Sequence, residues 1–123
     1  MPKLNLVSRE NAPDNMPLIE MTINKTKHLF LVDTGCSHSM FAKELLGGME
    51  IKPIGASEAL GVGGSHIAFI MPVRFNFCGV SLPELSVGPA LPPGVSGLIG
   101  QDLLQKFSIV EFNNRERTVT LIP

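Results

Sequence analysis

The sequence has little charge, few cysteines and no long apolar run, and each shortage excludes a class of protein. Charged residues make up 17% of the 123 residues and the net charge is −1, so we expect no nucleic-acid partner. The apolar runs are too short to span a membrane, and we expect no signal peptide. Two cysteines, Cys36 and Cys78, cannot build a disulfide framework, which favours a reducing, cytoplasmic setting.

Helical periodicity is also scarce, whereas turn-forming residues are plentiful. The 12 glycines and 10 prolines separate short apolar stretches, a pattern that predicts many short strands joined by turns. With 44% hydrophobic residues, the chain can form one modest core. We therefore expect a single all-β domain over residues 1–123, in which residues 1–15 form a short edge strand and a loop.

Alternating apolar and polar residues, together with turn signals between short strand-like stretches, predict the individual strands. We expect hairpins over 18–32 (with its turn at 24–27), 56–71 (with a glycine-rich tip at 61–64), 73–87 (with 82–87 as the return arm) and 108–123, and a short strand or extended piece over 50–54. Residues 42–46 predict a single helical turn. One true helix is expected over 101–107, with Asp102 in its first turn, where a negative charge suits the helix dipole.

Asp33 differs from the other aspartates because an apolar strand is predicted to lead into it. Phe30, Leu31 and Val32 form a run that reads as a buried strand. A carboxylate at the end of such a strand is costly unless a partner or a reaction uses it. Gly35 would let the chain turn sharply just after the acid. The alternative is an ordinary turn that begins with aspartate, which is common.

A single carboxyl group cannot act as both acid and base toward a peptide bond. Two carboxyls a few ångströms apart share a proton, so one activates a water and the other donates to the carbonyl oxygen. The sequence contains no second Asp-Thr-Gly or Asp-Ser-Gly. The second carboxyl would therefore have to come from another copy of the chain, across the twofold axis of a homodimer.

Three motifs together resemble those of retropepsin-like aspartic proteases, the single-lobe, homodimeric branch of the pepsin superfamily. They follow the family's order and approximate spacing: the turn around Asp33-Thr34-Gly35, the tip Gly61-Val62-Gly63-Gly64, and Leu98-Ile99-Gly100 before a helix. The resemblance implies a closed, barrel-like β lobe with a hairpin flap and one short helix near the C-terminus. It covers roughly residues 16 to 112.

The resemblance also implies an activity and a set of site residues. The activity is that of a homodimeric aspartic endopeptidase, without metal or cofactor, that cleaves extended peptides or a polyprotein between apolar residues. Asp33 supplies the catalytic carboxyl, Thr34 bonds across the twofold axis, and the carbonyl of Gly35 accepts from a substrate amide. The implied substrate-binding residues are Leu31, Ser37, Val62, Gly63, Pro93 and Leu98.

The sequence departs from the family at several places, among them His38, where retroviral enzymes often carry an acid, and a longer loop before Leu98. Cys36 replaces the usual alanine or serine after the glycine, and the chain continues after the helix into a hairpin that retroviral enzymes lack. Because Val119, Leu121 and Ile122 are more apolar than a free surface needs, we expect residues 108–123 at or near the dimer interface.

Three other functions are conceivable for this chain, and two of them are poorly supported by the sequence. A cysteine hydrolase would pair Cys36 with His38 or His66, but a neighbouring carboxylate disfavours a thiolate. A zinc site from Cys36, His38, His66 and Cys78 lacks paired ligand spacing. The serious alternative is a non-catalytic retropepsin-fold domain used for dimerisation or peptide binding.

Overall fold

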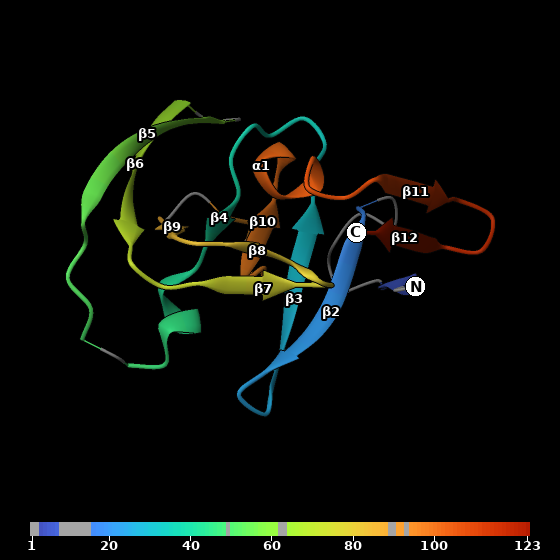
Figure 1. The fold of residues 1–123 in the computed structure, drawn as a ribbon, viewed down its shortest axis with the longest axis horizontal. Helices are drawn as coiled ribbons and strands as arrows, with labels where there is room; N and C mark the ends of the chain where they lie inside the picture. Colours follow the sequence, from blue (N-terminus) through green and yellow to red (C-terminus); the bar gives the residue numbers. More distant parts are fainter. Residues whose placement is uncertain (1–2, 8–15, 49, 62–63, 89–90, 93) are drawn as a thin grey trace.

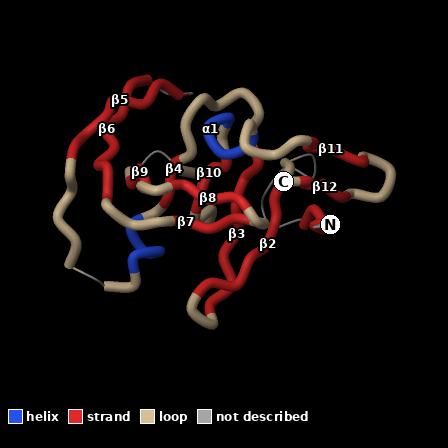
Figure 2. Tube along the Cα trace, in the orientation of Figure 1, coloured by secondary structure: helices blue, strands red, loops and turns tan. Residues whose placement is uncertain are grey.

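The computed structural model describes residues 3–7, 16–48, 50–61, 64–88, 91–92 and 94–123. Strands dominate this part of the chain, as predicted for an all-β protein (Figure 2). No helix within these ranges is long and apolar enough to cross a bilayer. In chain order the elements are β1 (Lys3–Val7), β2 (Leu18–Ile23), β3 (Thr26–Val32), β4 (Met40–Phe41), the 3₁₀ helix η1 (Lys43–Leu46), β5 (Gly55–Gly61), β6 (Gly64–Met71), β7 (Phe75–Phe77), β8 (Val80–Leu82), β9 (Leu85–Val87), β10 (Gly97–Ile99), α1 (Gln101–Leu104), β11 (Ile109–Asn113) and β12 (Thr118–Ile122).

The main sheet places strands from both ends of the chain side by side. Its order is β11-β12-β1-β2-β3-β10-β4-β9-β6-β5, while β7 and β8 pair separately (Figure 1). β1 lies between β12 and β2, so our expectation of an edge strand there is wrong. The cause is apolar pairing on both sides, because Leu4 is opposite Val119 and Leu6 is opposite Ile19. Residues 8–15 of the predicted N-terminal segment lie outside the described residues, and closure into a barrel stays a prediction.

Three of the predicted hairpins form antiparallel pairs, β2–β3, β5–β6 and β11–β12. The first turn is tighter than predicted, because Asn24 and Lys25 alone connect the strands and Thr26 already belongs to β3. Asn24 and Lys25 have φ values of 51° and 67°. This left-handed geometry is typical of two-residue hairpin turns, whose twist matches that of the strands.

The return arm predicted over residues 82–87 is wrong as a single strand. β8 pairs with β7, whereas β9 joins the main sheet between β4 and β6. Pro83 lies between them and cannot donate to a strand ladder, so the chain changes sheet there. Residues 50–54 form no strand; in this segment the Ile54 amide bonds to the Ile70 oxygen at 2.8 Å.

Both predicted helical segments exist, and the second is shorter than predicted. α1 ends at Leu104, because the amides of Lys106 and Phe107 bond to oxygens only three residues back and the chain then enters β11. The expected burial of Leu103, Leu104 and Phe107 is confirmed. The turn predicted over 42–46 is the 3₁₀ helix η1, which ends at Gly47 with φ 62°.

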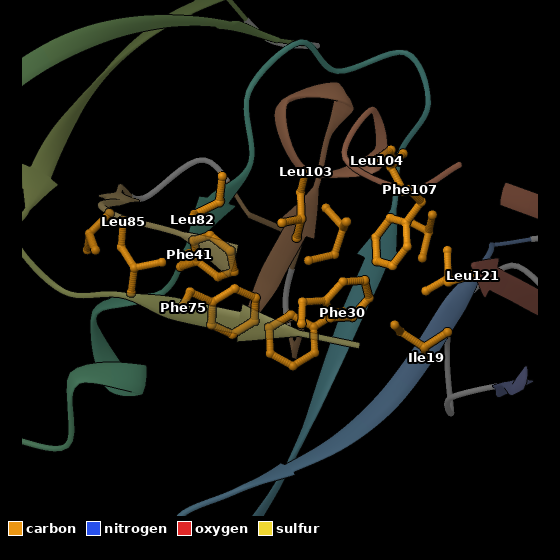
Figure 3. Close-up of a cluster of buried hydrophobic side chains, with 14 of the residues drawn as sticks. Ile19, Phe30, Phe41, Phe75, Leu82, Leu85, Leu103, Leu104, Phe107 and Leu121 are labelled. Carbon is orange, nitrogen blue, oxygen red and sulfur yellow. The ribbon is translucent and has the colours of Figure 1, made fainter. Parts of the chain in front are cut away.

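Phenylalanine side chains connect the two sheets in one core. The ring centroids of Phe41 in β4 and Phe75 in β7 are 4.7 Å apart, and those of Phe30 and Phe41 are 6.3 Å apart. These spacings are in the range that aromatic pairs prefer. α1 adds Leu103 and Leu104 to the same cluster, between the strands and the helix (Figure 3). The strand ends that carry the candidate site therefore rest on a packed core.

The apolar residues of the last hairpin are buried within their own chain. Val119 and Leu121 are 0% exposed, and Ile122 is half-buried. Their hydrophobicity is thus explained by the core of one lobe rather than by a second copy. A location of residues 108–123 at a dimer interface stays a prediction, now without that argument.

Candidate active site

Asp33 follows β3 directly, and its backbone is fixed on both sides. β3 pairs antiparallel with β2 and parallel with β10. The Asp33 amide donates to the Ile99 oxygen at 2.9 Å, and the Val32 amide donates to the Pro17 oxygen at 3.0 Å. The half-buried carboxyl therefore extends from a rigid strand end, as the sequence predicts.

Leu31 and Leu98 lie beside this carboxyl on one face of the sheet. They are direct neighbours in the parallel pair of β3 and β10, and both are half-buried. Their strand neighbours Phe30, Val32 and Ile99 are buried on the opposite face. Because strand side chains alternate, Leu31, Asp33 and Leu98 share the more open face. The structure thus brings two predicted substrate-binding residues next to the predicted catalytic residue.

The turn after Asp33 does not depend on glycine in the way that we expected. The Gly35 amide donates to Asp33 Oδ1 at 3.0 Å, and the Cys36 amide donates to the Asp33 oxygen at 3.2 Å. Gly35 has no positive φ, and a Cβ there would meet Asp33 Oδ1 at 3.4 Å, an ordinary contact. Thr34 and Gly35 are exposed, so the space beside them is not filled by other residues of the same chain.

The Asp33 loop, defined here as residues 33–39, is bound to the start of α1. The first amides of a helix need acceptors outside it, and this loop supplies them. Besides the Asp33–Ile99 bond, six hydrogen bonds join the two segments: Gln101 N to Cys36 O (2.8 Å), Asp102 N to Ser37 O (3.1 Å), Gln101 Nε2 to Thr34 O (2.8 Å), Gly100 N to Ser39 Oγ (2.9 Å), and Ser39 N and Oγ to Asp102 Oδ1 (2.9 and 2.6 Å).

Gly100 is the position where this contact excludes a side chain. A Cβ would lie 2.8 Å from the Cys36 oxygen and 2.9 Å from the His38 carbonyl carbon. Both are backbone atoms and cannot move aside without shifting the loop. The glycine is therefore required by close approach.

The pairing of Ser39 with Asp102 is the part of the site that the sequence did not predict. Asp102 had a sufficient local explanation in the first helical turn. Ser39 and Thr118 are the buried polar residues among those described. A serine just before the buried pair Met40 and Phe41 was the one available signal, since a buried hydroxyl needs a partner.

The remaining predicted residues are placed only in part. Ser37 is exposed, and its Oγ lies 3.0 Å from His38 Nδ1. Val62, Gly63 and Pro93 lie outside the described residues. The register of β5 and β6 runs to Gly61 opposite Gly64, so the predicted hairpin extends to its glycine-rich tip.

Among the described contacts, Cys36 is not paired with the His38 imidazole, as a cysteine hydrolase with that base would need. Cys36 Sγ donates to the His38 carbonyl oxygen at 3.0 Å, whereas the imidazole of His38 contacts Ser37. Burial raises the pKa of the Cys78 thiol above its ordinary value of 9.0, which keeps it neutral. Among the described residues, no group of three or more His, Cys, Asp or Glu side chains is arranged to hold a metal ion.

Comparisons with solved structures agree on the fold. A retropepsin-like aspartic protease from Rickettsia conorii is 18% identical with a TM-score of 0.56, over 98% of this chain and 88% of that chain. EIAV protease in complex with an inhibitor is 24% identical with a TM-score of 0.57, over 80% of this chain and 93% of that one. No family model and no curated protein sequence matches this chain. The chain therefore has a retropepsin-like fold.

Proposed function

We propose that two copies of this chain form an aspartic endopeptidase that cleaves extended peptides or a polyprotein between apolar residues. The observation that carries the proposal is the position of Asp33. Its carboxyl lies at a fixed strand end, on the open face that also presents Leu31 and Leu98. A carboxyl beside half-buried leucines suits a peptide whose apolar side chains flank the scissile bond.

In the proposed dimer, Asp33 faces Asp33 of the partner subunit across the twofold axis. The ionised carboxylate takes a proton from a water, whose oxygen bonds to the peptide carbonyl carbon. The protonated carboxyl gives its proton to the carbonyl oxygen. When the tetrahedral intermediate collapses, the C–N bond breaks and the leaving nitrogen accepts a proton from the carboxyl that was the base. One hydroxyl of the intermediate returns its proton to the other carboxyl, which restores the starting pair of one ionised and one protonated group.

Other exposed parts of the site support the same proposal. Thr34 and Gly35 are exposed, and Gly35 has room for a Cβ that its own chain would tolerate. The space beside Thr34 would allow contact with a second copy of the chain. The space beside Gly35 would allow contact with a substrate backbone. The β5–β6 hairpin, whose paired strands extend to Gly61 and Gly64, would close over the peptide as a flap.

The test uses Asp33→Asn, which keeps the shape of the side chain and removes the base. We expect the variant to fold and dimerise but not to cleave a library of peptides that wild type cleaves. Mixed with an equal amount of wild type and allowed to exchange, it should leave about a quarter of the activity of the same total amount of wild type, because only wild-type pairs work. A chain that works alone would leave about a half.

Glu20→Gln is the matched control, since it makes the same chemical change on an exposed residue of β2. It should leave cleavage unchanged. Peptide binding by wild type and by Asp33→Asn, with no cleavage by either, would replace the proposal with a non-catalytic peptide-binding domain. A strict monomer that cleaves peptides would contradict the shared pair of carboxyls.

A further inference from the structure

Ser39 and Asp102 form a buried contact that the proposed reaction does not use. Ser39 is 2% exposed, and both its amide and its hydroxyl donate to the same oxygen, Asp102 Oδ1. The Ser39 hydroxyl oxygen in turn accepts from the Gly100 amide at 2.9 Å. The amide and the hydroxyl of Ser39 therefore both have hydrogen-bond partners. The short 2.6 Å contact is typical of a hydroxyl bonded to a carboxylate.

The elements on both sides of this contact are held by other means. Ser39 precedes β4, which pairs with β10 and β9, and Asp102 follows β10 in α1. Those strands have their own ladders and rest on the phenylalanine core. The Asp33 loop between them is mostly exposed at Thr34, Gly35, Ser37 and His38. Its position therefore depends on hydrogen bonds to the helix start more than on packing.

We propose that Ser39 and Asp102 are positioning residues for the Asp33 carboxyl, an inference that rests on the proposed function. Together they fix the end of the Asp33 loop against α1, while Asp33 at its beginning is fixed by Ile99. Because the loop is anchored at both ends, the positions of Thr34 and Gly35 relative to the sheet are fixed. In a dimer with twofold symmetry, a displacement of the loop occurs in both subunits. It would therefore move both Asp33 carboxyls away from their positions for catalysis.

The first test is a kinetic comparison of Asp102→Ala, Asp102→Asn and Ser39→Ala in the full chain. Asp102→Ala removes the acceptor of two bonds, and a displacement of about 1 Å at a reacting group can lower a rate about 100-fold. We expect kcat to fall about 10- to 100-fold, with KM changed less than about threefold. Ser39→Ala keeps the backbone bond to Asp102 and should cost about tenfold.

Asp102→Asn separates positioning from charge. Its amide oxygen can accept from both donors of Ser39, so it should restore most of the kcat that Asp102→Ala loses. An Asp102→Asn variant as slow as Asp102→Ala would overturn the proposal, and so would an Asp102→Ala variant with wild-type kcat. If Asp102→Ala does not fold, Ser39→Ala carries the same test, because it changes one atom.

Thr118→Val is the control for removing a buried hydroxyl elsewhere. Thr118 is 5% exposed, and its hydroxyl has no hydrogen-bond partner among the described residues. This variant should keep wild-type kcat. An equal loss in Thr118→Val and Ser39→Ala, or a loss that matches the fraction of unfolded protein, would show a merely structural role.

Hydrogen exchange of the loop distinguishes failure of this inference from failure of the proposed function. The amides of Cys36 and Ser39 should exchange at least about tenfold faster in Asp102→Ala than in wild type or Asp102→Asn. If wild type cleaves nothing, the proposed function fails, and this exchange pattern still decides whether the pair orders the loop. If wild type cleaves and neither kcat nor exchange changes in the variants, the positioning role alone is wrong.

Discussion

The main sheet ends in a hairpin on each side, β5–β6 at one edge and β11–β12 at the other (Figure 1). Both are antiparallel, and each joins the rest of the sheet through three residue pairs, between β6 and β9 or between β12 and β1. Their side chains differ. Val119 and Leu121 in β12 are 0% exposed, whereas Ile67 and Phe69 in β6 are 63% and 51% exposed.

Since the backbone pairing is alike, the difference in burial should decide how stable each hairpin is. The end of the chain adds to this difference, because Pro123 lies against the turn between β7 and β8, within 3.1 Å of where a Cβ on Gly79 would be. We infer that β11–β12 belongs to the stable body of the lobe and that β5–β6 opens at lower free energy. We therefore expect strand pairing by itself to be a poor guide to the local stability of these two hairpins.

Two deletions should show the largest contrast between the hairpins. Removing residues 115–123 takes Val119 and Leu121 out of the core, so we expect no cooperative unfolding transition by circular dichroism. Replacing residues 59–66 with Asn-Gly joins Glu58 to its register partner Ile67 and should lower the free energy of unfolding by less than about 1 kcal/mol. The shortened hairpin should nevertheless abolish cleavage. A folded, active chain without residues 115–123 would contradict the comparison.

Single substitutions test the same difference on a smaller scale. Leu121→Ala should lower the free energy of unfolding by about 2–5 kcal/mol, because it leaves a cavity at a 0% exposed position. Ile67→Ala should change it by no more than about 0.5 kcal/mol. Denaturant titrations must be run at one protein concentration, since dimerisation adds to apparent stability. Equal losses at the two positions would show that β6 is buried by contacts outside this chain.

Thr118→Val should act in the opposite direction within β12. A buried hydroxyl without a partner costs free energy, and valine fills nearly the same volume in a strand. We expect the free energy of unfolding to rise by about 1 kcal/mol. Thr120→Val, at a half-buried position of the same strand, is the control and should change little. A loss of stability in Thr118→Val would mean that its hydroxyl has a bonding partner.

The smallest effect concerns pH and the turn beside Pro123. Burial raises the pKa of Cys78 in the folded chain above 9.0, whereas the unfolded thiol titrates near 9.0. Well below pH 9.0 the thiol is neutral in both states, and its contribution to stability is complete. Above it the unfolded thiol ionises first, so stability should decline as pH rises. Cys78→Ala should remove this part of the decline, and an identical pH profile in both proteins would speak against the burial of Cys78.

Local patterns in the sequence were sufficient for much of the fold. Alternation and turn signals, including the glycine-rich tip of 56–71, predicted three hairpins, and an apolar run predicted the strand that carries Asp33. Partner choice was not predictable in the same way. The interior position of β1 and the change of sheet at Pro83 depend on segments far away in the sequence.

In the candidate site too, local features were predicted from the sequence and contacts between distant residues were not. That Leu31 and Leu98 flank Asp33 was expected from motifs, and their register now supports it. The bonds between Ser39 and Asp102 were missed, because Asp102 had a local explanation in the first helical turn and a contact between residues so far apart in the sequence requires three-dimensional packing. The role given to Gly35 in the turn was wrong for the converse reason, since a local rule was applied where the backbone does not need it.

The pairing of β1 with β12 has a consequence for how the lobe is made. Lys3 lies opposite Thr120, so the two strands meet only after nearly the whole intervening chain has been brought together. Contacts this distant in sequence slow folding, because the loop must close before the pairing repays it. During synthesis β1 cannot pair with β12 until residues 118–122 have left the ribosome. Formation of the β1–β12 pairing should therefore be the last step of folding, detected as late protection of the Leu6 amide, which donates to the Arg117 oxygen at 2.8 Å.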